Sequence, residues 1–209
     1  MNKIVIVDYG LGNIQSVYNA FLALGADVAV TDNACEIDSA DKVVLPGVGA
    51  FDDTVKGLSE KGLDVAVKKA IEEGKPYLGI CMGLQVLFSS SEEGKLSGLC
   101  VFKGKVKKFL VKGNCKVPHM GWNTVEFKDK ENNPLASVID KDAYFYFVHS
   151  YYVQTDDSFI IGAQTEYAGV KFVSMVKKDN IFAVQFHPEK SQKIGLKMLE
   201  NFINLGEKC

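Results

Sequence analysis

The sequence predicts an α/β protein built on a doubly wound, mostly parallel sheet with an added antiparallel portion. In the first half of the chain, short runs rich in β-branched residues alternate with apolar-periodic stretches, as parallel strands and their connecting helices require. In the second half, strand-like segments are separated by Gly, Asn and Asp turns. No linker, repeat or low-complexity tract divides the 209 residues. We therefore expect one domain, residues 1–209.

In the first half, the continuous β-branched run at residues 3–9 predicts a strand buried on both faces. Gly10 and Gly12 end it before a stretch with helical spacing at residues 14–24. Further strands are expected at residues 27–31, 42–45 and 76–80, and a helix at residues 63–73, closed by Gly74.

In the second half, strands are expected at residues 105–111, 123–127, 144–148, 159–164, 170–177 and 181–186. A final helix at residues 192–205 covers the sheet.

Composition excludes several classes of function. The formal net charge of -2 offers no basic excess for nucleic acid or an anionic membrane. The five cysteines are odd in number and form no C-x-x-C pair, which disfavours a disulfide framework and a zinc site, and no His/Cys/Asp cluster predicts a metal. No run of about 18 apolar residues or secretory leader is present. We expect a cytoplasmic protein with neither metal nor cofactor.

The strongest chemical signal is Gly79-Ile80-Cys81-Met82-Gly83, where an expected strand runs into a turn that opens a helix. This is the nucleophile-elbow pattern with cysteine in the serine position. The tight turn needs small residues on both sides, and the N-terminus of the helix favours the thiolate. Cys81 is the candidate nucleophile. We expect the remaining cysteines to be ordinary packing residues; they are Cys35, Cys100, Cys115 and Cys209.

A thiolate needs a proton carrier, and His187 is the best candidate among three histidines. It stands at the C-terminal end of an expected strand, the edge where open α/β sheets place their sites. Glu189 follows two residues later, where it can accept from the imidazole and fix its tautomer. A surface histidine in a turn is the alternative.

Two of these segments, residues 79–85 and Phe186-His187-Pro188-Glu189, resemble the class I (triad) glutamine amidotransferases, whose fold is flavodoxin-like. Residues 9–13, 46–51, 118–123 and 146–151 narrow the resemblance to the glutaminase subunits of imidazole glycerol phosphate synthase. The likeness covers the whole chain. Departures are Met82 and Leu84, which are more often Leu and Met, and Gln15, where many members carry arginine.

The resemblance implies hydrolysis of L-glutamine to glutamate and ammonia, with Cys81 as nucleophile, His187 as proton carrier and Glu189 as its orienting partner. It also implies the roles of further positions. The oxyanion donors would lie at Val48, Gly49 and Met82, the glutamine contacts at Gly49, Gln85, His149, Ser150 and Tyr151, and the partner interface at Asn13, Trp122 and Lys190.

Ammonia released into neutral water becomes ammonium and is no nucleophile, yet glutaminase chemistry leaves no residues for an acceptor domain. A second polypeptide is therefore expected. The resemblance implies a (β/α)8-barrel cyclase forming a heterodimer with this chain. That cyclase uses ammonia to make imidazole glycerol phosphate and aminoimidazole carboxamide ribonucleotide in histidine biosynthesis.

Other functions stay open from the sequence. The chain could serve another synthase, such as anthranilate or aminodeoxychorismate synthase or a paralogous sugar-modifying pathway, although residues 118–123 disfavour the first two. It could be a cysteine hydrolase that does not use glutamine, or an idle binding protein, against which the intact Cys81, His187 and Glu189 speak.

Overall fold

The structure is a computed structural model that describes residues 2–110, 115–140 and 142–206. Its strands are β1 (Ile4–Val7), β2 (Val28–Thr31), β3 (Lys42–Gly47), β4 (Tyr77–Cys81), β5 (Phe88–Ser91), β6 (Phe102–Lys108), β7 (His119–Thr124), β8 (Glu126–Phe127), β9 (Tyr144–His149), β10 (Tyr151–Gln154), β11 (Ile161–Tyr167), β12 (Val170–Lys178) and β13 (Ile181–Val184). Its α-helices are α1 (Ile14–Ala23), α2 (Ala34–Ser39), α3 (Phe51–Glu60), α4 (Leu63–Glu72), α5 (Met82–Gln85) and α6 (Gln192–Ile203).

The central strands run parallel in the order β2-β1-β3-β4-β13, and β12, β10 and β6 continue the sheet on the side of β13. β12 is antiparallel to β13, β10 to β12, and β6 to β10, while β5 lies parallel to β6 at the edge. β11 and β8 extend the antiparallel part, and β7 pairs with β9 in a separate ribbon. The predicted fold class, parallel with an antiparallel addition, is confirmed.

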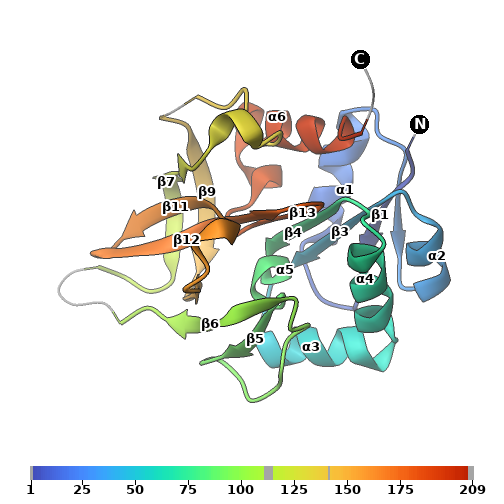
Figure 1. Cartoon of the computed structure of the whole chain (residues 1–209), viewed down its shortest axis with the longest axis horizontal. Coiled ribbons are helices and arrows are strands. Elements are labelled where there is room, and N and C mark those ends of the chain that lie inside the picture. The colour runs from blue at the N-terminus through green and yellow to red at the C-terminus, as the bar shows by residue number, and fades with distance from the viewer. Residues whose placement is uncertain (1, 111–114, 141, 207–209) are drawn as a thin grey trace.

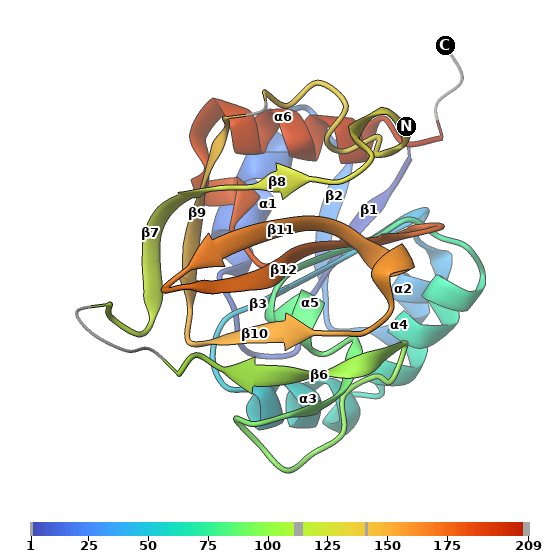
Figure 2. The ribbon, with the colours of Figure 1, turned by 60° about the vertical axis from the view of Figure 1, so that its left-hand side comes forward.

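Helices cover both faces of the parallel strands, with α1 and α6 on one side and α2, α3 and α4 on the other (Figures 1 and 2). Successive residues of β1 point to opposite faces, so Val5 and Val7 join one apolar cluster while Ile4 and Ile6 join the other. All four are fully buried, which explains the unbroken β-branched run.

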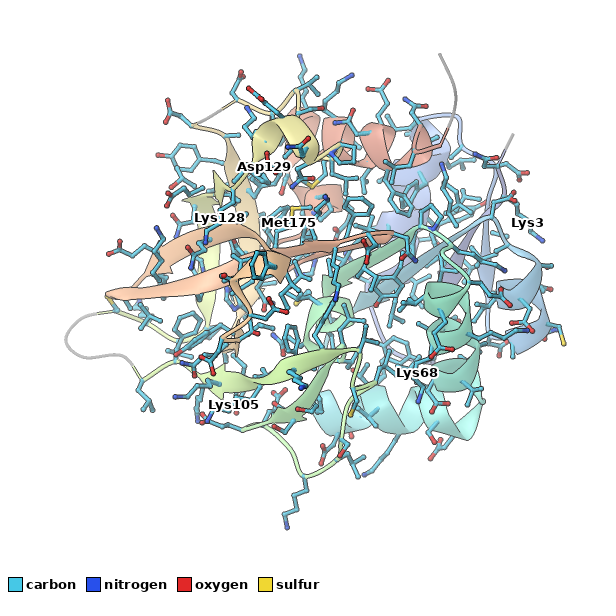
Figure 3. All side chains as sticks on the ribbon, viewed as in Figure 1. Lys3, Lys68, Lys105, Lys128, Asp129 and Met175 are labelled. Carbon is cyan, nitrogen blue, oxygen red and sulfur yellow. The ribbon has the colours of Figure 1, made fainter. Side chains whose placement is uncertain are left out.

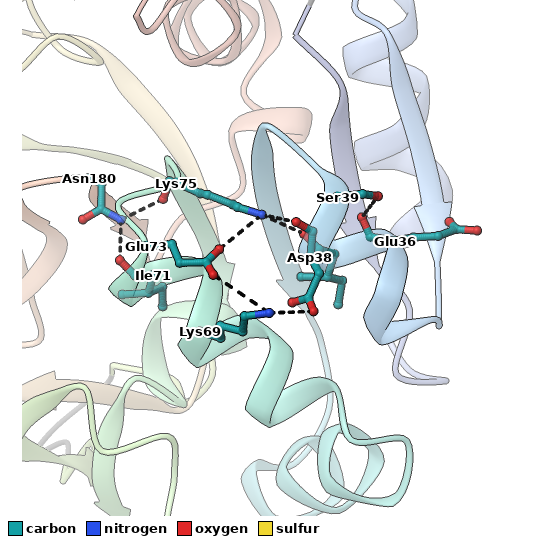
Figure 4. A network of polar contacts seen from close by, with 9 residues as sticks. Glu36, Asp38, Ser39, Lys69, Ile71, Glu73, Lys75 and Asn180 are labelled. Carbon is teal, nitrogen blue, oxygen red and sulfur yellow. Dashed lines mark hydrogen bonds and ion pairs between the residues drawn. The ribbon is translucent and has the colours of Figure 1, made fainter.

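A polar network ties α2 to α4 and α4 to the turn before β13 (Figure 4). Lys69 bonds Asp38 at 2.8 Å and approaches Glu73 at 3.9 Å, and Lys75 reaches Glu73 at 3.5 Å. Asn180 donates to the carbonyl of Lys75 at 2.7 Å. These ion pairs are wholly or partly open to solvent and contribute little each. Outward-facing lysines such as Lys105 and Lys128 contrast with the buried Met175 (Figure 3).

Several boundaries differ from the sequence prediction. The strand expected at residues 123–127 is wrong: β7 starts earlier and ends at Thr124, and β8 is a separate two-residue strand in the main sheet. The strand expected at residues 159–164 begins only at Ile161, after a 3-10 turn. β6 ends at Lys108, and the expected end at Val111 lies outside the described residues. The sequence patterns did not predict α2, α3, β5 or β10.

The cysteines also differ from the packing role expected of them. Cys35, Cys100 and Cys115 are free and exposed, whereas Cys81 is buried. Cys209 lies outside the described residues. In the part of the chain that the structure describes, no helix is long and apolar enough to cross a membrane.

Candidate active site

Cys81 ends β4 and stands directly before the single turn α5. β4 lies between β3 and β13 in the parallel part of the sheet (Figure 1). The backbone of Cys81 has φ 54° and ψ -101°, a conformation that side chains with a β-carbon rarely adopt. Such strain is typical of a nucleophile elbow. α5 spans only four residues, so its dipole is short and polar side chains must do more to favour a thiolate.

The glycines beside Cys81 are required by close backbone contact. A β-carbon on Gly79 would lie 2.5 Å from the carbonyl oxygen of Gly83, and one on Gly83 would lie 1.9 Å from that of Leu45. A β-carbon on Gly47 would meet Cβ of Met82 at 2.6 Å. The expectation that the turn needs small residues on both sides is confirmed.

His187 and Glu189 form a buried pair at the end of β13. Nδ1 of His187 lies 2.8 Å from Oε1 of Glu189, and the two side chains are 1% and 0% exposed. This burial rules out a surface histidine. Because Nδ1 is bound to a carboxylate, it carries a proton. Nε2 is therefore the ring nitrogen left for proton transfer. Among the described residues, Nε2 has no hydrogen-bond partner of ordinary geometry.

Cys81 acts on the same imidazole. Burial alone would lower the pKa of His187, but the negative charge and the nearby side chain of Cys81, together with the hydrogen bond to Glu189, outweigh it and raise the pKa to about 10. His187 is then an imidazolium at neutral pH, next to the sulfur of Cys81. Burial raises the pKa of Tyr9 to about 12, and the charge of Cys81 adds to that rise.

Two glutamines complete the surroundings of the thiol. Nε2 of Gln185 donates to Sγ of Cys81 at 3.5 Å, and Nε2 of Gln85 donates to Oε1 of Gln185 at 3.0 Å. Gln85 also donates to the carbonyl of Tyr151 at 3.1 Å, so both of its amide hydrogens are used. Its Oε1 has no partner among the described residues.

Cys81 opens into a cavity of about 340 Å³. The predicted oxyanion and glutamine positions meet there: the lining residues are Val48, Gly49, Cys81, Met82, Gln85, Glu93, Pro118, Val148, His149, Ser150 and Tyr151. Gly49 has φ 112°, which only glycine adopts freely. The structure thus brings all seven predicted positions to one cavity with the candidate nucleophile.

Glu93 also lines this cavity, and no sequence pattern predicted it. Its Oε2 accepts from the N–H of Phe51 at 2.9 Å. Burial raises the pKa of Glu93, partly offset by that hydrogen bond. Glu93 stands beside a second acidic residue in a Ser-Glu-Glu-Gly loop, with no spacing that would have marked it as a site residue.

His149 shapes the cavity wall through a chain of hydrogen bonds. Its Nδ1 lies 2.7 Å from the carbonyl of Tyr151 and therefore carries the proton. Its Nε2 must then accept from Nδ1 of His119 at 2.9 Å, and Asn123 is 3.3 Å from Nε2 of His119. Burial lowers the pKa of His149 to about 3 and that of His119 to about 4, so both rings are neutral.

Of the three positions expected at a partner interface, two adjoin Glu189 and the third lies on β7. Nδ2 of Asn13 donates to Oε1 of Glu189 at 3.2 Å. Lys190 is exposed immediately after it. Trp122 is 46% exposed on β7 and meets Tyr146 edge-on, with ring centroids 6.0 Å apart. A core position for Trp122 is thereby excluded.

Within the described ranges, no group of three or more His, Cys, Asp or Glu could hold a metal ion.

Comparison with known proteins places this geometry in a family. Residues 5–205 match the family described as glutamine amidotransferase class-I, and the chain belongs to it. Within that class, it is 48% identical over 201 residues to imidazole glycerol phosphate synthase subunit HisH 2 of Methanococcus maripaludis, covering 96% of this chain and 98% of that protein. Subunit HisH of Trichodesmium erythraeum is 46% identical over 204 residues, covering 98% and 95%.

Solved structures share the fold at lower sequence identity. The chain superimposes on PurLQS from Thermotoga maritima with a TM-score of 0.75 at 19% identity, covering 98% of this chain and 99% of that one. For a glutamine amidotransferase from the same organism the TM-score is 0.68 at 13% identity, covering 97% and 96%. The sequence-based assignment to the class I amidotransferases, with its likeness to imidazole glycerol phosphate synthase subunits, is confirmed.

Proposed function

We propose that this chain is the glutaminase subunit of imidazole glycerol phosphate synthase and that Cys81, His187 and Glu189 carry its chemistry. The observation that supports this most strongly is a cysteine on a strained elbow, interacting with an imidazole that a buried carboxylate orients. That arrangement is a nucleophile, proton carrier and orienting partner at the floor of a cavity.

The cavity offers complementary groups for both ends of glutamine. The unpartnered Oε1 of Gln85 accepts a hydrogen bond, as the substrate's amide N–H requires. The Glu93 carboxylate, half-buried and held by the Phe51 N–H, suits an α-ammonium group. His149, Ser150 and Tyr151 line the remaining wall.

In the first half-reaction, Sγ of Cys81 bonds to the side-chain carbonyl carbon of glutamine and the oxygen becomes an oxyanion. Backbone N–H groups from Met82 and the Val48–Gly49 segment would stabilise it. Collapse breaks the C–N bond, and the His187 imidazolium gives its proton to the departing nitrogen, which leaves as ammonia. Water then attacks the thioester while His187 takes its proton. The C–S bond breaks, and glutamate and the thiolate are released.

A partner surface lies next to this chemistry. The outer face of the β7–β9 ribbon exposes Met120, Trp122 and Tyr144, with exposed fractions of 63%, 46% and 55%. Large exposed aromatic and apolar side chains grouped together mark interaction sites. We propose that a (β/α)8-barrel cyclase binds here, near Asn13 and Lys190, and receives ammonia for histidine biosynthesis. The free thiols support a cytoplasmic location.

A reactive glutamine analogue tests the assignment directly. A diazoketone in place of the side-chain amide should alkylate Cys81, and excess glutamine should slow the labelling by competing for the cavity. Mass spectrometry of the Cys81 and Cys35 peptides reads both sites in one sample. Labelling of Cys35 as fast as Cys81, or no protection by glutamine, would exclude a glutamine site and favour a cysteine hydrolase of other specificity.

A further inference from the structure

Gln185 is a fully buried polar side chain that no role assigned so far explains. It follows β13 directly, and its backbone N–H donates to the carbonyl of Ser174 at 2.9 Å, which continues the pairing with β12. Side chains two residues apart in extended backbone point to the same side. Gln185 and His187 therefore reach Cys81 together, from one strand end.

The orientation of the Gln185 amide is fixed by its neighbours. Gln85 has already given one amide hydrogen to the Tyr151 carbonyl and gives the other to Gln185. The atom of Gln185 that receives it must be the oxygen. The NH₂ group of Gln185 is thus the part that faces Sγ of Cys81, at 3.5 Å.

We propose that Gln185 stabilises the thiolate of Cys81 by donating a hydrogen bond to it, and that Gln85 is the positioning residue that holds Gln185 in the donating orientation. A hydrogen bond to the charged form of a group favours that form. Because α5 is only one turn long, its dipole stabilises a thiolate less than a longer helix would. The hydrogen bond from Gln185 supplies part of that stabilisation. The proposal deepens the proposed glutaminase function and rests on Cys81 being its nucleophile.

Other titratable groups face the same thiol and must stay constant in the test. They are His187 from the end of β13, Tyr9 from the loop after β1, and Glu93 and His149 from the cavity wall. A neutral replacement at Gln185 leaves all of them in place. Methionine has nearly the volume of glutamine and lacks the donor.

The test is the pH profile of alkylation of Cys81 by iodoacetamide in the full chain, read from the Cys81 peptide by mass spectrometry. In Gln185→Met the half-reaction pH, which is the pH at which alkylation of Cys81 runs at half its maximal rate, should rise by about one unit. This corresponds to about tenfold less thiolate at lower pH, while the maximal rate at high pH stays at the wild-type level. Ser174→Ala is the control. It removes a buried hydroxyl on the adjoining strand β12, and this hydroxyl has no hydrogen-bond partner among the described residues. It should leave the half-reaction pH unchanged.

An unchanged half-reaction pH in Gln185→Met, or an equal rise in Ser174→Ala, would overturn the proposal. If Gln185→Met does not fold, a pH titration of the wild-type protein by NMR replaces it. The side-chain amide signals of Gln185 should shift around the same pH at which alkylation of Cys81 is half-maximal, while those of the exposed Gln154 should not shift there. Static Gln185 signals would overturn it as well. Because no glutamine is used, the result can be read even if the glutaminase assignment fails.

Discussion

Cys81, His187 and Glu189 differ in how directly each touches the reacting atoms. His187 is bound to Glu189 at 2.8 Å on one side and interacts with Cys81 on the other, so in the proposed reaction it is the group that moves a proton between nucleophile and leaving group. In the same proposal Glu189 acts through the ring that it orients, and Nδ2 of Asn13 donates to Oε1 of Glu189 at 3.2 Å.

His187→Asn should therefore lower kcat for glutamine hydrolysis by about 100- to 10,000-fold, the usual contribution of a positioned proton carrier. Glu189→Gln should cost less, because it perturbs the tautomer and orientation and leaves the imidazole present. Steady-state kinetics on variants with wild-type circular dichroism spectra measures the order. If His119→Asn or His149→Asn were as damaging as His187→Asn, His187 would not be the proton carrier.

Sequence patterns predicted the residues that a local motif marks, and missed those that only the fold brings in. Cys81 lies in an elbow pattern and His187 with Glu189 in a strand-end pattern. Glu93 and Gln185 carry no such spacing. Glu93 reaches the cavity because α3 places the Phe51 N–H against it, and α3 itself was missed. Gln185 stood out only as part of the strand before His187.

At the scale of elements, the elbow depends on how closely α5 packs on β3. Helix propensity alone predicts that Gly83→Ala stabilises the protein by about 0.5–1 kcal/mol. The structure predicts the opposite, because the new β-carbon would lie 1.9 Å from the carbonyl oxygen of Leu45. We expect a loss of about 1–3 kcal/mol in the free energy of unfolding, measured in urea, together with slower alkylation of Cys81.

Gly25→Ala is the comparison for that variant. Gly25 has φ 76°, and apart from its own atoms and those of its two chain neighbours, no atom of the described residues lies within 4 Å of the position that a β-carbon would take there. The change should cost only the backbone strain, about 1–2 kcal/mol, and leave Cys81 alkylation at the wild-type rate. Equal alkylation in the two variants would show that the Gly83 contact does not shape the elbow.

The β7–β9 ribbon gives folding stability a dependence on pH through His119 and His149. Both have folded-state pKa values lowered by burial, to about 4 and about 3, whereas an unfolded histidine takes up its proton near pH 6.5. Below pH 6.5 the unfolded chain binds more protons, so stability falls as the pH falls toward 4. It is unaffected by these groups above pH 6.5.

Between pH 6.5 and pH 5 the loss should be on the order of 2 kcal/mol for each histidine. Urea unfolding at pH 7.5 and pH 5 measures it. A variant carrying both His119→Gln and His149→Gln should lose less between these two pH values. A double variant with the same acid loss as the wild type would show that the ribbon histidines are not its source.

The predicted elements that matched are those whose pattern is local and complete, such as the buried run of β1 and the periodic apolar face of α4. α3 was missed because Gly57 interrupts it, yet that glycine is needed where a β-carbon would lie 2.6 Å from the Tyr9 carbonyl oxygen. β9 and β10 are separated only by Ser150 but join different sheets. Such long-range pairing leaves no trace in the spacing of side chains.

For the whole molecule, the reacting cavity and the exposed ribbon face are neighbours, since the N–H of His187 donates to the carbonyl of Tyr146 on β9 at 2.9 Å. A partner seated on that face can therefore act on the triad. That the chain is one domain stays a prediction, although β13 joins both halves in one sheet.

The chain alone should hydrolyse glutamine slowly, and the cyclase with a bound ribonucleotide analogue should accelerate it. The peptide around Gly49, at φ 112°, can rotate at little steric cost and so present or withdraw an oxyanion donor. Coupling of about 1–3 kcal/mol corresponds to about 5- to 150-fold in affinity, and kcat can respond more. Equal rates for the chain alone, with cyclase and with cyclase plus analogue would exclude this gating. Gly49→Ala is the variant that tests the peptide rotation. Gly47→Ala is unsuitable, because its β-carbon would lie 2.6 Å from Cβ of Met82.

Release of ammonia from glutamine depends, in the proposed reaction, on Cys81 as the nucleophile. The most direct measurement is the rate of glutamate formation by the wild type, Cys81→Ala and the exposed-thiol control Cys35→Ala, each assembled with the cyclase and its ribonucleotide. We predict loss of hydrolysis in Cys81→Ala alone, with synthesis from added ammonia preserved because that ammonia bypasses this site. Glutamate formation by Cys81→Ala at the rate of Cys35→Ala would contradict the role of Cys81 as the nucleophile.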